Sequence, residues 1–135
     1  MTAHSRAVAV LAALLALGTA RATAQSVHEI RMVADGNGEF RFVPASVAAK
    51  RGDVLLFRAV SGAPHSVAFE RKDVSDPVRE ALNSALPRRA GDLSSPLLTD
   101  GTEYRIVVPA LPPGGYRFFC LPHRAYDMRG ELVVR

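Results

Sequence analysis

Cysteine is almost absent from this sequence of 135 residues, which contains only Cys120. A lone cysteine excludes an intramolecular disulfide as a source of stability. Its thiol must therefore be buried and inert, paired with another chain, catalytic, or bound to a metal. The residues around Cys120 decide between these four roles.

Long apolar segments are also missing after residue 24, since none approaches the roughly 20 apolar residues that a transmembrane helix needs. We therefore expect no membrane span in the mature protein. The N-terminal apolar run, residues 7–18, is short and precedes the small-residue sequence Ala-Thr-Ala at residues 22–24. This arrangement is typical of a secretory signal peptide with its cleavage site. We expect residues 1–24 to be removed, and a retained N-terminal anchor is the alternative.

Residues 25–135 have the usual length of one domain and can bury one modest core. The segment before them has no twin-arginine pair and no cysteine that could carry a lipid. We expect an ordinary exported protein, periplasmic or extracellular, that folds as a single domain and is a monomer.

A strong excess of one charge is missing from this domain. Without Arg6 and Arg21, 15 basic side chains accompany 13 acidic ones. The basic residues are scattered, and the few close pairs form no aromatic-basic pattern: Lys50-Arg51, Arg71-Lys72 and Arg88-Arg89. Nucleic acid is therefore not an expected partner.

Most of the domain consists of short segments separated by glycine and proline, which indicates an all-β sandwich or barrel. Apolar and polar side chains alternate with a period of two in six segments: 28–35, 39–44, 53–60, 103–108, 114–120 and 130–135. Such alternation is typical of half-buried antiparallel strands, whereas a parallel sheet covered on both faces would give continuous apolar runs. We expect antiparallel pairing.

One segment breaks this pattern and predicts a short helix over residues 76–86, inserted between strands. Asp76 is an N-cap candidate, and Pro77 suits the first helical position. Val78 and Leu82 lie on one helical stripe, which would pack on the sandwich.

The residues with metal-binding chemistry are concentrated between Cys120 and Met128. Alternation along residues 114–120 places Cys120 at the end of a strand with its sulfur toward the core. The short loop before Met128 holds His123 near both of them. His65 follows a Gly-Pro turn and points inward at the start of another strand.

Two imidazoles, a thiolate and a thioether form a soft-to-borderline donor set, which favours copper over magnesium, calcium or manganese. A plane of two histidines and one cysteine with a weak axial methionine is typical of blue-copper electron-transfer sites. General metal-site behaviour further predicts a backbone hydrogen bond to the sulfur near Ser66 and a carbonyl that fixes the His65 ring. His28 has no partner motif, and we expect it at the surface.

Two other functions are open. A thiol enzyme could use Cys120 as nucleophile with His65 or His123 as base, but burial would raise the thiol pKa and leave Met128 without a purpose. Copper carriage without redox work would favour exposed and exchangeable donors, which a strand end and a proline-containing loop do not offer.

The sequence resembles the cupredoxins, and among them the plastocyanin and azurin-like proteins. The motifs that carry the resemblance are "PHSV" (64–67), "YRFFCLPHRAYDM" (116–128) and "RGELVV" (129–134). The likeness also covers "FRFVPASVAAKRGDVLLF" (40–57), which is similar to the early strands of the family.

This resemblance implies a Greek-key β-sandwich of about eight strands with one type 1 copper ion at one end. It implies His65, Cys120, His123 and Met128 as the ligands. The protein would be a one-electron carrier rather than an enzyme, and it would meet redox partner proteins through a weak, transient interface near His123.

Two features depart from the family pattern. Asp127 stands where the family often has glycine before the methionine, at a position that favours positive φ. The segment between Phe69 and Glu103, which contains the expected helix, is long for the simplest members.

Overall fold

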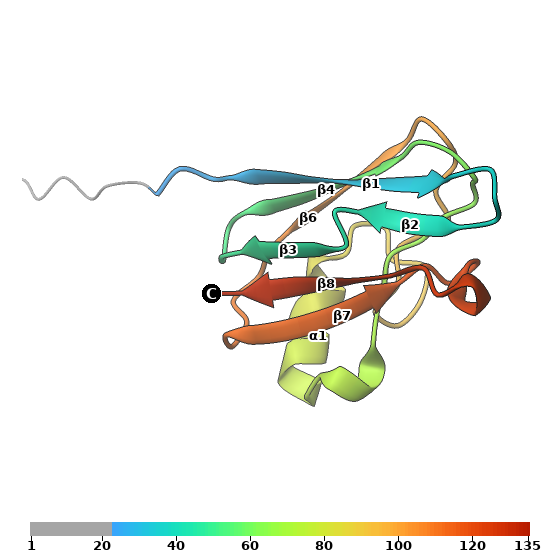
Figure 1. The fold of residues 1–135 in the computed structure, drawn as a ribbon. Coiled ribbons are helices and arrows are strands. Elements are labelled where there is room, and N and C mark those ends of the chain that lie inside the picture. Colours follow the sequence, from blue (N-terminus) through green and yellow to red (C-terminus); the bar gives the residue numbers. More distant parts are fainter. Residues whose placement is uncertain (1–22) are drawn as a thin grey trace, which may run out of the picture.

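The computed structural model describes residues 23–135, and within them the chain forms two facing four-stranded sheets (Figure 1). The first sheet has the order β2 (Phe40–Val43), β1 (Val27–Ala34), β4 (Val54–Ala59) and β6 (Glu103–Val107). The second has the order β3 (Ser46–Ala49), β8 (Arg129–Val134), β7 (Gly114–Phe119) and β5 (Ala68–Phe69). The predicted all-β, cupredoxin-like Greek-key sandwich is confirmed. The predicted signal peptide, residues 1–24, lies outside the described residues except for its last two.

The core lies between the two sheets and contains the apolar positions of the alternating segments. Ile30 and Met32 of β1 are fully buried, as the alternation predicts. At the centre, the ring of Phe118 meets Phe42 edge to face at 4.9 Å and Phe57 at 5.4 Å between centroids. Each such aromatic pair contributes about 0.5–1.5 kcal/mol beyond its buried area. These contacts join the two sheets beside the strand end that carries Cys120.

Strand pairing is mixed, so the prediction of purely antiparallel strands was wrong for two pairs. β1 pairs with β4 in parallel, and β3 pairs with β8 in parallel. The cause is that the chain leaves the first sheet after Pro44, adds β3 to the second sheet, and then returns to place β4 beside β1. The sequence of β4 is consistent with this arrangement, because Val54–Phe57 is a continuous buried run of the kind found in parallel strands that are covered on both faces.

The predicted helix is present as α1 (Asp76–Ala85), with Val78 and Leu82 buried. Its N-cap is Ser75 rather than Asp76, because the Ser75 carbonyl already accepts the first helical hydrogen bond. The proline therefore lies within the first helical turn, where its missing N–H has no cost.

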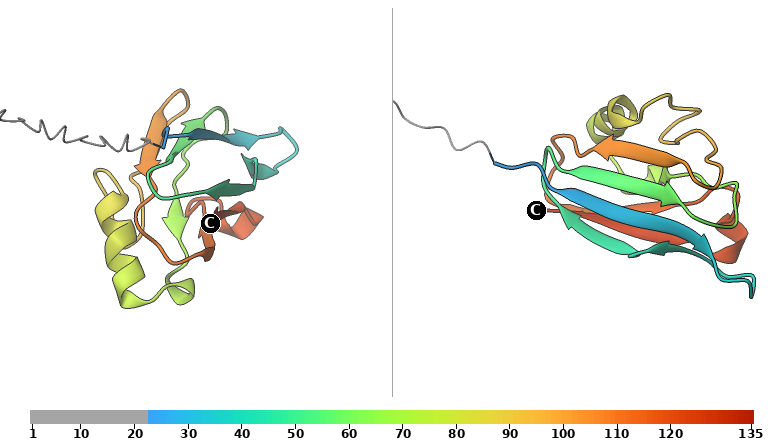
Figure 2. Two further views of the ribbon diagram at one scale, coloured as in Figure 1. Left: turned by 90° about the vertical axis from the view of Figure 1, so that its left-hand side faces the viewer. Right: turned by 90° about the horizontal axis from the view of Figure 1, so that it is seen from above.

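α1 runs along the side of the sandwich where β5 and β6 form the sheet edges (Figure 2). The chain that follows the helix is tied back to β6, because the Tyr104 hydroxyl donates to the Pro87 carbonyl at 2.8 Å. Two short 3-10 turns complete the fold, η1 (Arg71–Asp73) and η2 (Arg124–Tyr126). The connection from β4 to β5 and the connection from β7 to β8 lie at the end of the sandwich remote from the C terminus (Figure 1).

In the part of the chain that the structure describes, no helix has the length and apolar character needed to cross a membrane.

Candidate metal centre

Three donor atoms converge where these two connections meet. The ligand atoms of His65, Cys120 and His123 all lie within 4.8 Å of one another. The Cys120 Sγ is 3.4 Å from Nδ1 of His123 and 3.8 Å from Nδ1 of His65. All three side chains are buried. The structure thus brings together the cysteine and both histidines that the sequence indicates, although His65 is 55 residues from Cys120.

A backbone carbonyl fixes the ring of His65, as expected. Its Nε2 lies 2.7 Å from the carbonyl oxygen of Ser61. Because a carbonyl can only accept, Nε2 must carry the hydrogen, and Nδ1 presents a lone pair toward the sulfur of Cys120. The backbone of His65 is held by two hydrogen bonds with Leu98, of 3.0 and 2.8 Å. This imidazole is therefore oriented in advance as a metal ligand.

The environment of Cys120 combines burial with one backbone donor. The N–H of Ser66 donates to Sγ at 3.3 Å, which confirms the predicted hydrogen bond near Ser66. The hydroxyl of Ser66 also accepts from the Leu121 N–H at 2.9 Å and so links the two connections. Burial raises the pKa of the Cys120 thiol, and the hydrogen bond from Ser66 partly opposes that rise. Without a cation the thiol stays protonated, and a bound cation would take the thiolate instead.

His123 is held by its loop and by an aromatic ring. Its N–H donates to the Cys120 carbonyl at 3.2 Å, and its own carbonyl accepts from Tyr126 N–H at 3.0 Å. The ring of Phe40 stacks on the imidazole with centroids 3.7 Å apart and planes 12° from parallel. Burial lowers the pKa of His123, and the neighbouring His65 lowers it further, so the ring is neutral and able to coordinate at neutral pH.

The period-two alternation of residues 39–44 puts Phe40 on the same face of its strand as Phe42, but it does not show the contact with His123. Phe40 is only half-buried because it lies at the end of the sandwich, above the site. The alternation was the available signal, and the partner ring could be identified only from the fold.

Met128 is fully buried beside these residues. Its carbonyl accepts from the Cys120 N–H at 3.0 Å, and its N–H donates to the His123 carbonyl at 3.4 Å. Asp127 precedes it with φ 59° and ψ 33°, in the left-handed region. The expectation that this position favours positive φ is therefore confirmed, and a short polar side chain tolerates this conformation better than most.

The donors present fit copper. Two imidazole nitrogens and one thiol sulfur make a soft-to-borderline set, whereas hard cations prefer oxygen ligands. Within residues 23–135, no aspartate or glutamate joins this cluster. A buried thiol that faces an imidazole lone pair is a suitable place for a thiolate-binding cation.

His28 lies apart from the centre, at the opposite end of the sandwich. Its side chain is only 28% exposed, because Nε2 donates to Asp53 Oδ2 at 3.0 Å. The ring is partly exposed, which is compatible with the expected surface position, but it has a partner in Asp53. The partner is 25 residues away in the sequence, which local patterns do not reveal.

Comparison with known proteins agrees with this site. Residues 28–135 match the family of copper binding proteins of the plastocyanin/azurin type. Plastocyanin of Vicia faba is 32% identical over 98 residues, which are 73% of this chain and 91% of that protein. The chloroplastic plastocyanin minor isoform of Arabidopsis thaliana is 29% identical over 129 residues, 96% of this chain and 67% of that protein. The oxidized plastocyanin structure from Dryopteris crassirhizoma has a TM-score of 0.62 at 27% identity, covering 80% of this chain and all of that one.

The chain belongs to the plastocyanin/azurin family of copper-binding proteins. It is a plastocyanin-like copper protein, and the members of its family are electron carriers rather than catalysts. The thiol-enzyme alternative is therefore set aside.

Proposed function

We propose that this protein is an exported type 1 copper protein that carries single electrons between redox partners. His65, Cys120, His123 and Met128 would hold the ion, with Met128 as the weak axial ligand. The observation that supports this most directly is the convergence of the Cys120 sulfur with two histidine Nδ1 atoms in a buried site. A copper ion bound there would supply one-electron chemistry between Cu(II) and Cu(I).

The protein's own contribution is to keep the donors in place. His65 is fixed by the Ser61 carbonyl, Cys120 by the end of β7 and the Ser66 N–H, and His123 by its stacking on Phe40. Donors held this way cannot rearrange freely when the charge of the site changes. A fixed ligand set lowers the structural reorganisation that accompanies each electron transfer.

Burial of the donors favours electron transfer over copper carriage. His65 and Cys120 are 0% exposed, and His123 is 7% exposed. A carrier that hands its ion to another protein needs ligands that a second protein can reach and displace. Here a competing ligand would meet His123 first, because the other two donors have no exposed surface.

This loop also provides the proposed docking surface for redox partners. Leu121 and Tyr126 are 56% and 59% exposed, although both are large and apolar in character, and Pro122 between Leu121 and His123 is exposed as well. Apolar side chains that surround a nearly buried ligand suit the small and weak interfaces of transient electron transfer. We propose that a monomer uses this surface.

The test is a visible absorption spectrum of the mature protein after Cu(II) is added, compared with the Cys120→Ser variant. We expect an intense thiolate-to-copper band that bleaches on reduction and is absent from the variant. N-terminal sequencing of the secreted material should begin at Gln25, because the cleavage site follows Ala24. Absence of the band, with Cys120 still open to a thiol reagent, would overturn the proposal. A secreted product that begins at Met1 would overturn its export by a cleaved signal.

A further inference from the structure

A buried carboxylate lies beside the metal-binding loop without belonging to the donor cluster. Glu70 follows β5, and its side chain is only 9% exposed. Its backbone N–H donates to the Arg117 carbonyl on β7 at 2.9 Å, so the residue is anchored on the second sheet. Burial of a carboxylate is costly unless the group is paired, so its partners indicate its role.

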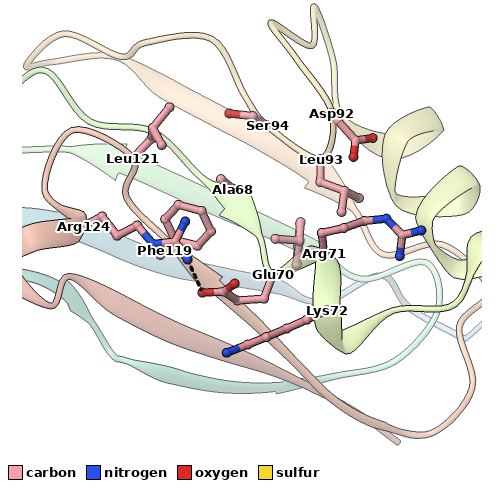
Figure 3. A pocket seen from close by; sticks show the side chains of 11 residues that line it. Ala68, Glu70, Arg71, Lys72, Asp92, Leu93, Ser94, Phe119, Leu121 and Arg124 are labelled. Carbon is pink, nitrogen blue, oxygen red and sulfur yellow. Dashed lines mark hydrogen bonds and ion pairs between the residues drawn. The ribbon is translucent and has the colours of Figure 1, made fainter.

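One partner of Glu70 comes from the middle of the loop between β7 and β8, and the other directly follows the end of that loop. Its Oε1 accepts from Arg129 Nη1 at 3.0 Å and from Arg124 Nη2 at 3.5 Å. Figure 3 shows the contact with Arg124 at the edge of a pocket on this side of the sandwich. Arg124 directly follows His123 in the chain, and Arg129 directly follows Met128.

Each arginine has a second contact that fixes its direction. The Arg124 guanidinium lies over the ring of Phe119, 4.2 Å from its centroid. Arg129 Nε donates at 2.7 Å to the side chain of Asp127, the residue in the left-handed conformation. The carboxylate of Glu70 is therefore linked to the loop by two arginine side chains whose directions are fixed.

We propose that Glu70 is a positioning residue that clamps the metal-binding loop. This inference rests on the proposed copper function. One anchored carboxylate holds the residues immediately after His123 and Met128, so the two ligands cannot move independently of the second sheet. Its negative charge also balances two nearby cations, which would otherwise favour the less positive Cu(I) state of the site.

A matched control lies three residues away. Asp73 accepts two hydrogen bonds from Arg117, at 2.6 and 2.7 Å, and neither side chain makes a hydrogen bond or ion pair with residues 120–128. Glu70→Gln and Asp73→Asn each remove one carboxylate charge from the same region. Only the first of them acts on residues next to the proposed ligands.

The first measurement is amide hydrogen exchange of Tyr126 and Asp127 in the metal-free protein. These N–H groups donate to the carbonyls of His123 and Arg124 and report opening of the loop. We expect exchange to be about tenfold faster in Glu70→Gln, as loss of a charged hydrogen bond predicts. Exchange in Asp73→Asn should stay at the wild-type rate.

The second measurement is the reduction potential of the copper-loaded proteins. We expect a more positive potential for Glu70→Gln and the wild-type value for Asp73→Asn. If Glu70→Gln does not fold, Arg129→Gln removes the shorter of the two contacts and should also speed exchange.

Wild-type exchange rates and potential in the variant that removes the clamp would overturn the inference. A wild-type protein without a thiolate-to-copper band would instead overturn the proposed function. Exchange in the metal-free protein tests the clamp in either case.

Discussion

The ring of His65 shows how one hydrogen bond decides the chemistry of a side chain. The Ser61 carbonyl accepts a hydrogen bond from Nε2–H, so the hydrogen stays on Nε2 and the Nδ1 lone pair is directed at the sulfur of Cys120. Without that carbonyl, either nitrogen could carry the proton. Which nitrogen of this residue can bind a metal is therefore set by its neighbour as much as by its own type.

At the same scale, we predict that Met128→Gln lowers the reduction potential while the thiolate-to-copper band is kept. An amide oxygen is a harder donor than a thioether and stabilises Cu(II) relative to Cu(I). Voltammetry of the two proteins measures this shift. Met32→Leu changes another fully buried methionine, on β1, and should leave the potential as it is. An unchanged potential in Met128→Gln would argue against its role as the axial ligand.

At the scale of elements, the turn after β4 supports the site. The Ser61 hydroxyl bonds to both backbone groups of Ala34, with the N–H at 3.0 Å and the carbonyl at 3.2 Å. Gly62 follows with φ +80°, and a Cβ at this position would overlap the Cβ of Ala34. Only glycine combines that backbone conformation with such a close approach to β1. This turn positions the Ser61 carbonyl, which orients the ring of His65.

We predict that Gly62→Ala lowers the free energy of unfolding by about 2–4 kcal/mol, because it adds backbone strain and a steric clash. Gly52→Ala is the control, since Gly52 has φ +88° but a Cβ added there would meet no other atom within 4 Å. That variant should lose only about 1 kcal/mol, the cost of the conformation alone. Urea unfolding of the metal-free proteins measures both values. Equal losses would show that the contact with Ala34 does not matter.

At the scale of the whole molecule, the two ends of the sandwich have different tasks. One end holds the donor cluster. At the other end, Asp53, which precedes β4, holds neighbouring segments together by hydrogen bonds. The carboxylate of Asp53 accepts from the N–H groups of Ser26 and Lys50, at 3.2 and 3.1 Å, and from the ring of His28 at 3.0 Å. These bonds tie the start of β1 to the turn before β4.

The hydrogen bonds of the Asp53 carboxylate predict that the folded protein loses stability in acid. The hydrogen bond from His28, followed by that from the Lys50 N–H, lowers the pKa of Asp53 from its ordinary 3.8 to about 2. A carboxylate with a lowered pKa in the folded state stabilises the protein above about pH 4, and that stability is lost as the pH falls toward 2. In urea unfolding at pH 5, 4, 3 and 2, Asp53→Asn should therefore lose less stability across this range than the wild type. Parallel pH profiles for the two proteins would contradict the assignment.

Much of the fold and the site could be predicted from local pattern. A period of two identifies which side chains of a strand face inward, so the burial of Ile30, Met32 and Cys120 followed from their positions. Close spacing in the chain predicts that His123 and Met128 lie near Cys120. The chemistry of these soft and borderline donor groups, imidazole, thiolate and thioether, then indicates copper.

Strand neighbours and long-range partners could not be predicted in this way. Periodicity describes the faces of one strand and contains no information on which strand lies beside it, so the parallel pairing of β1 with β4 was missed. The stacking of Phe40 on His123 and the pairing of Glu70 with two arginines join residues more than 50 positions apart. The sequence by itself determined the candidate donors, the inward faces and the helix, because these depend on local spacing. Only the tertiary structure decided what surrounds and holds the donors, because those contacts exist only once both sheets have packed together.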